Sequence, residues 1–592
     1  MELVPGIKVA VQTVLAEKYY YQSEIDDILI NETKPEFSGD YTVVLFSFAK
    51  ILKSSPDKMG QELGQALLAA RPEWFAGFNV IKGFLNLVLA DTVLTDFLHA
   101  QYNQPSFGKQ PSNGKRVMIE YSSPNTNKPL HLGHLRNNFL GWSVAAIYRA
   151  CGYDVIKTCI ANDRGIHICK SMVAWKLFGN GATPESTGIK GDHFVGDYYV
   201  LFGVELKKQV EVAVAAGLSK EDAEREAPLM KSAQQMLIDW ESGVTEVIEL
   251  WKKMNSWVYS GFDITYQRIG SDFDKVYYES QTYLLGKDLV ELGLQKKVFF
   301  QKEDGSVWID LVAEGLDEKI VQRSDGTSVY MTQDIGLVVE KYEEFHADLS
   351  VYVVADEQNY HFKVLKLICQ KLELPSAAGI YHLSYGLVEL PTGRMKTREG
   401  TVVDADDIID EMTGIAAHHT EELGKVEDFT IDERKELYDT IGLGALKFFL
   451  LRVDPKKRMV FNPDESIDFH GFTGPFIQYT YARIKSILRR EDIGKFPEDE
   501  VTSLFPLEKQ LLIWLEKYGL LLQQACSDMN PSLVANYVYG LAKIFNSFYA
   551  EHSVSRAETE EKKQLRVRIC VMIANVIQSS MGLLGIRVPE RM

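Results

Sequence analysis

The sequence predicts a multidomain protein in which α/β units are followed by an all-α unit. Its 592 residues are enough for about four domains. Apolar residues at 117–119, a helical pattern over 132–150 and a second apolar run at 154–160 predict strand, helix and strand, which is how a parallel sheet begins. From about Phe461 onward apolar residues recur at helical spacing, so the last unit is expected to be a helical bundle.

Composition and charge exclude several classes of protein. Hydrophobic residues make up 46% and charged residues 25%, which is typical of globular domains and excludes a disordered or fibrous chain. The net charge is −18, so a polyanionic partner has to be held by a local basic patch. The six cysteines include no C-x-x-C pair, so neither a zinc site nor a disulfide framework is expected. Because Met1 is not followed by a cationic and apolar leader, and no apolar run approaches about 18 residues, we expect no membrane segment and a cytoplasmic location.

Turn-rich and periodic segments divide the chain further. A polar stretch with Pro105 and Gly108, residues 101–114, marks the first boundary. Residues 219–257 are predicted to be helices within or beside the sheet, with Ser219 as a cap, and segments 297–300 and 307–311 are predicted to form a hairpin around Asp304. Strands are expected at 349–354 and 382–387. We therefore expect four units, at 1–110, 111–400 with an insertion around 290–330, 401–460 and 461–592.

The first chemically informative cluster runs from Glu120 to His134, directly after the first predicted strand and into the helix. His131 and His134 are three residues apart, so they project from one face of the first helical turn. Free N–H groups and the positive end of the helix dipole attract phosphate at such a position. Gly133 lacks the side chain that would block a nucleotide. Two incidental histidines at a helix start are the alternative explanation.

A second cluster lies at residues 394–401, after the strand expected at 382–387. It places three cations, Arg394, Lys396 and Arg398, in a short segment next to Gly400. This pattern favours a phosphate-binding loop. A solvated charged surface is the alternative explanation, because most charge runs are of that kind.

Together the two clusters resemble the HIGH and KMSKS signatures of class I aminoacyl-tRNA synthetases, and their surroundings resemble the arginyl-tRNA synthetases. The resemblance extends over nearly the whole chain, through segments 37–42, 83–86, 162–165, 478–483 and 588–592. It implies a Rossmann-type parallel-sheet catalytic domain, a small α/β N-terminal domain that binds tRNA, a connecting stem and a C-terminal helical bundle that binds the anticodon. It also implies ATP-dependent ligation of L-arginine to tRNA through an arginyl-adenylate, with release of AMP and pyrophosphate.

The resemblance assigns roles in ATP binding and catalysis. It implies that ATP is bound by His131, Gly133, His134, Met395 and Lys396, and that the catalytic residues are His131, His134, Lys128, Lys396 and Arg398. The loop departs from the family pattern, because Arg398 stands where a second lysine is usual, and arginine is not equivalent to lysine around phosphates. In arginyl enzymes that lack this lysine, the resemblance implies that a lysine just upstream of the HIGH motif replaces it, and Lys128 matches that position. Mg²⁺ is expected on the ATP phosphates.

Recognition of arginine needs carboxylates, because the planar fork of guanidinium donors is best matched by bidentate acceptors. Glu120 and Asp334 are candidates, and Tyr330 shares a face with Asp334 if a helix starts there. The resemblance assigns these three residues to the guanidinium. It assigns Asn125 and Gln358 to the α-amino and carboxylate end, and it includes Ser122 among the arginine-binding residues.

A local reversal of charge suggests a tRNA-binding surface. Residues 447–490 contain nine Lys or Arg and four acids, a local charge of +5, with aromatic side chains at Phe472, Phe476, Tyr479 and Tyr481 for stacking on unpaired bases. Aromatic residues in the bundle core with a solvated cationic rim are the alternative. The tRNA-binding candidates are Lys456, Lys457, Tyr479, Arg483, Met592 and Asn86, and a monomer is expected.

Two other classes of protein compete with a synthetase. A small-molecule nucleotidyltransferase shares the H-x-G-H helix and a phosphate loop, but it does not need a helical tail or a separate N-terminal domain. A non-catalytic tRNA-binding paralogue keeps the architecture but is expected to lose some histidines, loop cations or pocket acids, and these positions are all filled. ATP–pyrophosphate exchange with arginine, with and without tRNA, separates the three.

Overall fold

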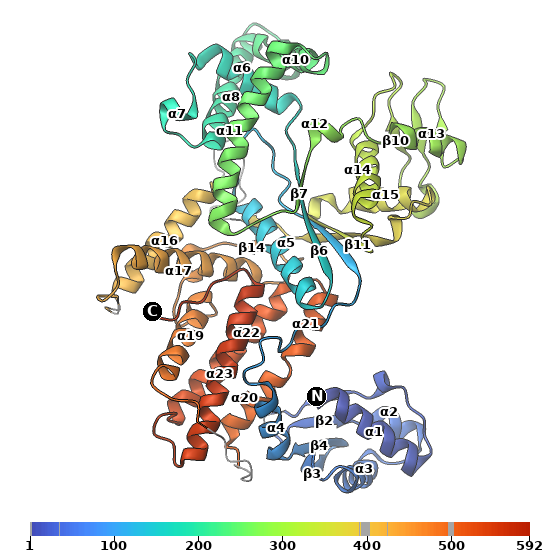
Figure 1. Ribbon diagram of the computed structural model, residues 1–592. Coiled ribbons are helices and arrows are strands. Elements are labelled where there is room, and N and C mark those ends of the chain that lie inside the picture. Colours follow the sequence, from blue (N-terminus) through green and yellow to red (C-terminus); the bar gives the residue numbers. More distant parts are fainter. Residues whose placement is uncertain are drawn as a thin grey trace.

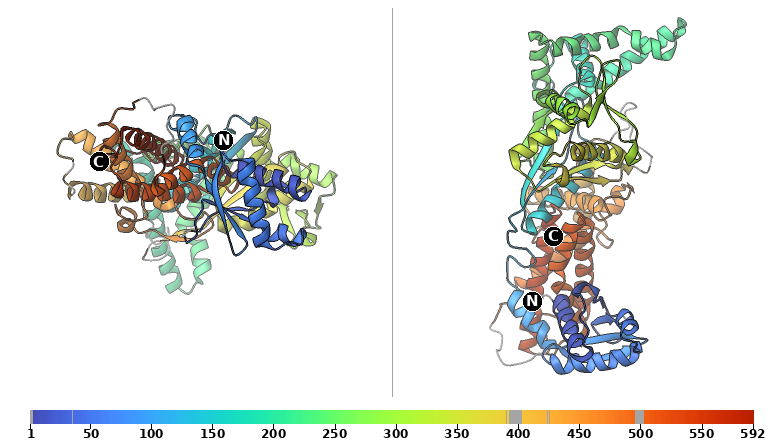
Figure 2. Two further views of the ribbon diagram at one scale, coloured as in Figure 1. Left: turned by 90° about the horizontal axis from the view of Figure 1, so that it is seen from below. Right: turned by 90° about the vertical axis from the view of Figure 1, so that its right-hand side faces the viewer.

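The structure is a computed structural model that describes residues 3–34, 36–389, 391, 403–422, 424, 426–494 and 503–592. The molecule is elongated, with the N-terminal unit at one end and a group of inserted helices at the other (Figure 2). The parallel sheet lies between the inserted helices and the C-terminal bundle (Figure 1). Multidomain α/β plus all-α architecture is therefore confirmed.

A five-stranded parallel sheet, counted over the described residues, forms the centre of the α/β unit. Its order is β12-β11-β5-β6-β7, and renumbering these strands along the chain gives the doubly wound order 5-4-1-2-3. The first strand is buried on both faces at Val117, Met118 and Ile119, as expected when helices cover both sides. The strands are β5 (Arg116–Glu120), β6 (Asp154–Ala161), β7 (Lys275–Tyr278), β11 (Leu349–Ala355) and β12 (Ile380–Tyr385).

Helix α5 (Leu132–Ala150) connects β5 to β6, so the predicted strand, helix and strand are confirmed. A group of helices then separates β6 from β7 and projects away from the sheet (Figure 1). The predicted helical segment 219–257 belongs to this group, and the Ser219 hydroxyl caps α9 by accepting from Asp222 N. The group consists of α6 (Ile166–Phe178), α7 (Pro184–Thr187), α8 (Gly191–Ala215), α9 (Lys220–Glu226), α10 (Pro228–Glu241) and α11 (Thr245–Ile269).

A smaller antiparallel sheet follows β7, in the order β10-β9-β8. The predicted hairpin is confirmed, because β8 (Phe299–Gln301) pairs with β9 (Val307–Ile309) around Gly305, whose φ of +87° favours glycine. β10 (Lys319–Gln322) completes this sheet, and α13 (Lys287–Gln295) packs on β8. Two helices then flank β11, α14 (Tyr330–Phe345) and α15 (Asn359–Lys371).

The N-terminal unit is a small antiparallel sheet with helices, in the strand order β1-β2-β4-β3. It contacts the C-terminal bundle through ion pairs from Lys509 to Asp40 (2.9 Å) and from Lys517 to Glu32 (2.6 Å). Its strands are β1 (Ile30–Glu32), β2 (Tyr41–Val44), β3 (Phe75–Ile81) and β4 (Phe84–Leu89). Its helices are α1 (Leu3–Tyr19), α2 (Phe46–Ile51), α3 (Pro56–Ala70) and α4 (Asp91–Gln101).

The C-terminal part is helical, as predicted. Pro531 starts α22, and the predicted apolar positions Val534, Val538, Leu541 and Phe545 are completely buried. A two-stranded contact between β13 (Val388–Glu389) and β14 (Met459–Val460) joins this part to the sheet region. The helices are α16 (Ala405–Glu422), α17 (Ile431–Leu451), α18 (Pro463–Ser466), α19 (Gly474–Leu488), α20 (Pro506–Glu516), α21 (Tyr518–Ser527), α22 (Pro531–Glu551) and α23 (Glu560–Leu583).

Two further features concern the cysteines and the long helices. All six cysteines are buried, and each is a free thiol. Among the described residues, no helix combines the length and the apolar character needed to cross a bilayer.

Candidate active site

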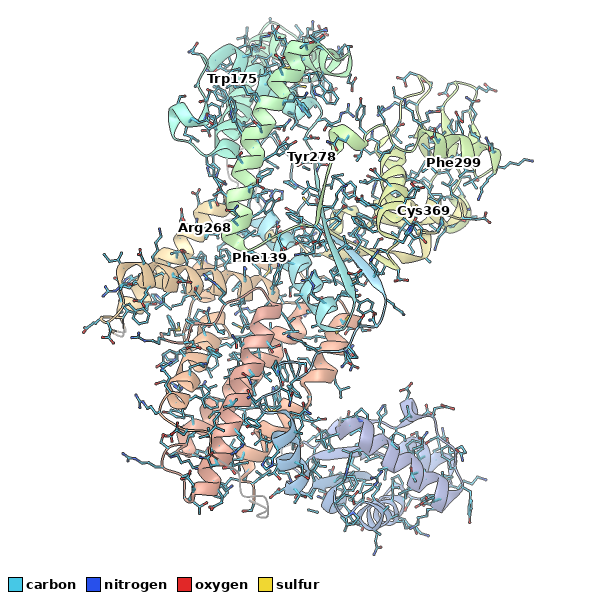
Figure 3. The ribbon with its side chains drawn as sticks, viewed as in Figure 1. Phe139, Trp175, Arg268, Tyr278, Phe299 and Cys369 are labelled. Carbon is cyan, nitrogen blue, oxygen red and sulfur yellow. The ribbon has the colours of Figure 1, made fainter. Side chains whose placement is uncertain are left out.

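Segments that follow four strands meet at one edge of the parallel sheet. β5 leads into the loop before α5, β6 into residues 162–165, β7 into α12 (Glu279–Thr282), and β11 into the 3-10 turn Asp356–Gln358. Tyr278, the last residue of β7, marks this edge in Figure 3. The strand order reverses between β5 and β11, which is where ligands bind in open α/β sheets. Predicted site residues far apart in the sequence therefore come to the same edge.

His131 and His134 together cap the start of α5. Nδ1 of His131 accepts from Gly133 N at 3.1 Å, and Nδ1 of His134 accepts from His131 N at 3.1 Å. Burial, with Lys128 nearby, lowers the pKa of His131 to about 4, and burial also holds the pKa of His134 well below its ordinary value. Both rings are therefore neutral at pH 7. Because each Nδ1 accepts, each Nε2 carries the proton and is a hydrogen-bond donor.

Lys128 is a cation close enough to this pair to affect both rings. Burial lowers the pKa of its ammonium, and its charge in turn lowers the pKa of both histidines. Among the described residues, no carboxylate lies within ion-pair distance of Lys128. A partly buried ammonium without a counter-ion at a helix N-terminus is suited to an anionic ligand such as phosphate.

The predicted cationic loop lies outside the described residues, together with Arg394, Met395, Lys396 and Arg398. The segment that follows it is described. Val403 O accepts from Leu132 N at 3.4 Å, Leu130 O accepts from Ala405 N at 3.0 Å, and His131 pairs with Asp404 as an isolated bridge. The chain after the loop is thus bonded to the HIGH motif.

Glu120 forms an ion pair with Lys341, a residue that was not predicted from the sequence. Its Oε2 lies 2.5 Å from Nζ of Lys341 in α14, and both side chains are buried. The Lys341 ammonium also lies 5.2 Å from the ring centre of Tyr277 and 5.1 Å from that of Tyr352. In this structure the Glu120 carboxylate has a buried counter-ion, and its assignment to the guanidinium stays a prediction.

Asp334 is the fifth residue of α14, which begins at Tyr330 as predicted. Its Oδ2 is 2.6 Å from Nε2 of His361, and its side chain is 40% exposed, so a ligand can still reach it. The carboxylate of Glu279, directly after β7, is close enough for Asp334 to contribute to its titration. Burial first, and then Asp163 and Asp334, raise the pKa of Glu279 to about 6. Carboxylates are the type of group that accepts hydrogen bonds from a guanidinium.

Glu279 was not predicted from the sequence. Tyr330 and Glu279 line one cavity of about 650 Å³, together with Arg164 and Tyr283. Tyr330 is 73% exposed, so it is accessible to a ligand there. The sequence signal that could have pointed to Glu279 is the run Lys-Val-Tyr-Tyr at 275–278, which is typical of a strand and ends directly before it.

The remaining arginine-binding candidates have different surroundings. Ser122 is buried, its backbone has a φ of +83°, and its hydroxyl lies 2.6 Å from the hydroxyl of Tyr266 and accepts from Asn138 Nδ2 at 3.1 Å. Ser122 therefore shapes the turn after β5. Asn125 and Gln358 are exposed at the ends of β5 and β11, on the two sides of the point where the strand order reverses.

Comparison with known proteins agrees with this geometry. The family model described as "tRNA synthetases class I (R), catalytic domain" matches residues 96–462, which is more than half of the chain. The chain belongs to the arginyl-tRNA synthetases. The model "Arginyl tRNA synthetase N terminal domain" matches residues 6–89, and "DALR anticodon binding domain" matches residues 477–592.

Individual relatives extend over the full length. The arginine–tRNA ligase of Parabacteroides distasonis is 50% identical and covers 100% of this chain and 98% of its own. That of Bacteroides thetaiotaomicron is 50% identical and covers 99% of each. The arginyl-tRNA synthetase of Thermus thermophilus has the same fold, with a TM-score of 0.81 over 100% of both chains at 24% identity. ATP-dependent charging of tRNA with arginine is the reaction of this family.

Three of the candidate tRNA-binding residues meet in the anticodon-binding domain of this synthetase family. Tyr479, Arg483 and Met592 line a cavity of about 360 Å³. The Arg483 guanidinium lies 4.9 Å from the ring centre of Tyr479 and 5.4 Å from that of Tyr549. Other cations line the same cavity, namely Arg489, Arg490 and Arg591. The site is therefore basic, with aromatic rings between its cations.

Other tRNA-binding candidates do not belong to this cavity. Asn86 is 1% exposed, its Oδ1 accepts from Thr42 and its Nδ2 donates to Asn79, so this structure does not present it on the surface, and its assignment as a tRNA contact stays a prediction. Tyr481 is 2% exposed and packs in the core, so it cannot stack on a base. Lys447 is buried, donates to Gly585 O at 2.6 Å, and does not contribute to a cationic surface.

Lys456 and Lys457 are exposed but lie elsewhere. They occupy the turn between α17 and β14, where Asp454 accepts from Asn530 at the start of α22. The cavity with Tyr549 lies at the opposite end of α22. Because a helix rises 1.5 Å per residue, these two basic places are about 28 Å apart along α22. The positive charge of residues 447–490 is thus not one surface.

Proposed function

We propose that this chain joins arginine to ATP at the edge of the parallel sheet and then transfers the arginyl group to a tRNA held by the helical domain. The best support is that a site suited to phosphates and a site with two carboxylates lie at the same edge of the parallel sheet. Neutral histidines and the Lys128 ammonium lie at the α5 N-terminus after β5, and the carboxylates of Glu279 and Asp334 lie near the end of β7. The first site suits phosphates and the second suits a guanidinium.

Adenylate formation needs alignment more than acid–base chemistry. The arginine carboxylate, already ionised at pH 7, attacks the α-phosphorus, the bond to the bridging oxygen breaks, and pyrophosphate leaves. The Nε2–H donors of His131 and His134 and the Lys128 ammonium are proposed to hold the phosphate charge. A ribose hydroxyl at the tRNA end then attacks the arginyl carbonyl carbon, and AMP leaves.

Magnesium is proposed to enter with ATP. Mg²⁺ prefers oxygen ligands and keeps several waters, so it usually binds through substrate phosphates and one or two carboxylates. Among the described residues, one group of acidic and histidine side chains has metal-like spacing, Asp192, His193 and Asp406, and the Lys190 ammonium already lies within it. That group does not fit a metal ion, so the proposal gives the protein no metal site of its own.

Arginine selection is tested by Asp334→Asn, which keeps the shape and removes the charge. Loss of a charge-assisted hydrogen bond costs roughly 1.5–3 kcal/mol, so the KM for arginine is expected to rise about 10- to 150-fold in ATP–pyrophosphate exchange. The KM for ATP is expected to change far less. Glu343→Gln is the matched control, because Glu343 is an exposed acid on the same helix.

The same assay has a pH signature. Glu279, with a pKa of about 6, is charged above that pH and becomes neutral as the pH falls through it. The wild-type KM for arginine is therefore expected to rise below about pH 6, and this rise should be absent in Glu279→Gln.

If Asp334→Asn raises the KM for ATP and leaves that for arginine unchanged, Asp334 belongs to the nucleotide site and the proposed pocket is wrong.

Binding of tRNA is proposed to centre on the basic cavity of the helical domain. Arg489 and Arg490 are exposed at its rim, so changing both to Glu should weaken tRNA binding without disturbing the core. Removing one cation that neutralises a phosphate is expected to reduce the slope of log affinity against log salt by about 1. The slope is measured by titrating tRNA at several salt concentrations.

Lys456→Glu with Lys457→Glu is the matched control, because it makes the same change of charge at the other end of α22. We expect a smaller change of slope there. If the control flattens the salt dependence more than the arginine variant does, the main tRNA surface lies at the junction with the sheet, and the cavity is not its centre.

We also propose that the chain works as a monomer in the cytoplasm, where ATP and tRNA are present. The boundaries 1–110, 111–400, 401–460 and 461–592 remain part of this proposal, supported by family matches to 6–89, 96–462 and 477–592.

A further inference from the structure

A cluster of five charged side chains lies between the inserted helices and the segment after the cationic loop. Nζ of Lys190, at the N-cap of α8, is 3.0 Å from Asp192, 2.6 Å from Asp406 and 2.6 Å from the Thr265 hydroxyl on α11. Nε2 of His193 is 3.2 Å from Asp404 and 3.3 Å from Asp406. We call these residues, Lys190, Asp192, His193, Asp404 and Asp406, the α8–α16 cluster.

The cluster is a tightly built junction. Asp192 is fully buried, and a Cβ at Gly261 of α11 would lie 2.3 Å from its Oδ1. A Cβ at Gly191 would lie 2.0 Å from Trp257 O, so the start of α8 contacts α11 at two glycines. Larger residues at either position would separate the helices and the charges. The contact between these helices therefore sets the positions of Lys190 and His193.

The cluster continues directly into the HIGH motif. The Asp404 carboxylate forms an ion pair with His193, and the Asp404 backbone forms the isolated bridge to His131. Oδ1 of Asp404 also accepts from Asp406 N at 2.7 Å, which fixes the turn into α16. The same short segment thus touches both the cluster and the histidine that caps α5.

The charges favour a salt-bridge network over a metal site. Lys190 supplies one cation. Ion pairs with Asp404 and Asp406 raise the pKa of His193 to about 10, so His193 supplies a second cation at neutral pH. These two cations face three carboxylates, so no further cation is needed to balance most of the charge.

We propose that Lys190 and His193 are positioning residues for adenylate formation. Through Asp404 and Asp406 they hold segment 403–405 against residues 130–132, and so hold His131 in place for the ATP phosphates. This inference rests on the proposed binding of ATP at the N-terminus of α5. It gives the inserted helices a role in the first reaction step that does not require them to touch substrate.

The test is ATP–pyrophosphate exchange with His193→Gln and Lys190→Met in the full chain. Residues that act through a network change coupling by about 2- to 30-fold, so the KM for ATP is expected to rise by that factor. The KM for arginine is expected to stay within about two-fold, because the Glu279 and Asp334 carboxylates lie elsewhere. His193→Lys keeps a cation facing Asp404 and Asp406 and should restore most of the ATP affinity.

Asp410→Asn is the matched control. It breaks the Arg268–Asp410 ion pair (2.6 Å), which joins the same helices α11 and α16 but is not one of the ion pairs of the α8–α16 cluster. Arg268 lies at the end of α11 that approaches α16 (Figure 3). This variant is expected to leave both KM values unchanged.

Three outcomes overturn the inference. The first is an unchanged KM for ATP in both cluster variants, and the second is an equal rise in Asp410→Asn. The third is a fall in kcat alone, which is what partial unfolding produces when it lowers the active fraction. If one of these variants does not fold, Asp404→Asn is measured in its place. It removes the charge that faces His193 and is likewise expected to raise the KM for ATP. Absence of exchange by the wild-type chain with its tRNA present contradicts the proposed function itself and is distinguishable from all three.

Discussion

Lys128→Ala is expected to slow adenylate formation by about 10²- to 10³-fold and to leave arginine binding nearly intact. The ammonium is partly buried beside His131 and His134, and burial lowers its pKa. No carboxylate in the part of the chain that the structure describes pairs with it, so its charge is available to the phosphates. Charge developing on the transferring phosphoryl group is stabilised by such a preorganised cation. Single-turnover formation of the adenylate is the measurement.

Lys115→Ala is a suitable control, because Lys115 is an exposed lysine next to the opposite end of β5. It should be indistinguishable from wild type. If Lys128→Ala also behaves like wild type and Lys396→Ala is inactive, the loop supplies the essential cation. The idea that Lys128 replaces the missing loop lysine is then wrong.

Lys341→Met is expected to lower the free energy of unfolding by about 3–5 kcal/mol, because it leaves the Glu120 carboxylate buried without a counter-ion. Lys341 and Glu120 are 2% and 9% exposed in their side chains, and water cannot replace the missing ammonium. Denaturant titration of the full chain, followed through the transition of the parallel-sheet unit, measures the loss.

The double variant Lys341→Met with Glu120→Gln removes both charges and should recover most of this stability. Lys275→Met is the control, since it breaks an ion pair with Glu344 that is 44% and 35% exposed and should cost less than about 1 kcal/mol. A double variant as unstable as Lys341→Met alone would show that packing of the lysine chain, and not the charge of Glu120, dominates.

Several features were predictable because their causes are local in the sequence. The strand, helix and strand of 116–161 follow from apolar runs and helical spacing, and Ser219 and Pro531 start their helices through capping geometry that needs only neighbouring residues. Asp304 and Gly305 specify the hairpin in the same way. The motif around His131 and His134 likewise specifies its own capping arrangement.

The sequence alone determined the fold class, the family resemblance and the identity of the histidine pair, because these depend on short-range patterns and on contiguous motifs. Only the tertiary structure decided which charges meet. Lys341 is paired with Glu120 across 221 positions, Glu279 is brought near enough to Asp334 for that carboxylate to raise its pKa, and Lys456 is separated from Arg483 by the length of α22. Periodicity assigns a side chain to a face of its own helix or strand, but the partner across that face is set by the packing of distant elements, which no local pattern records.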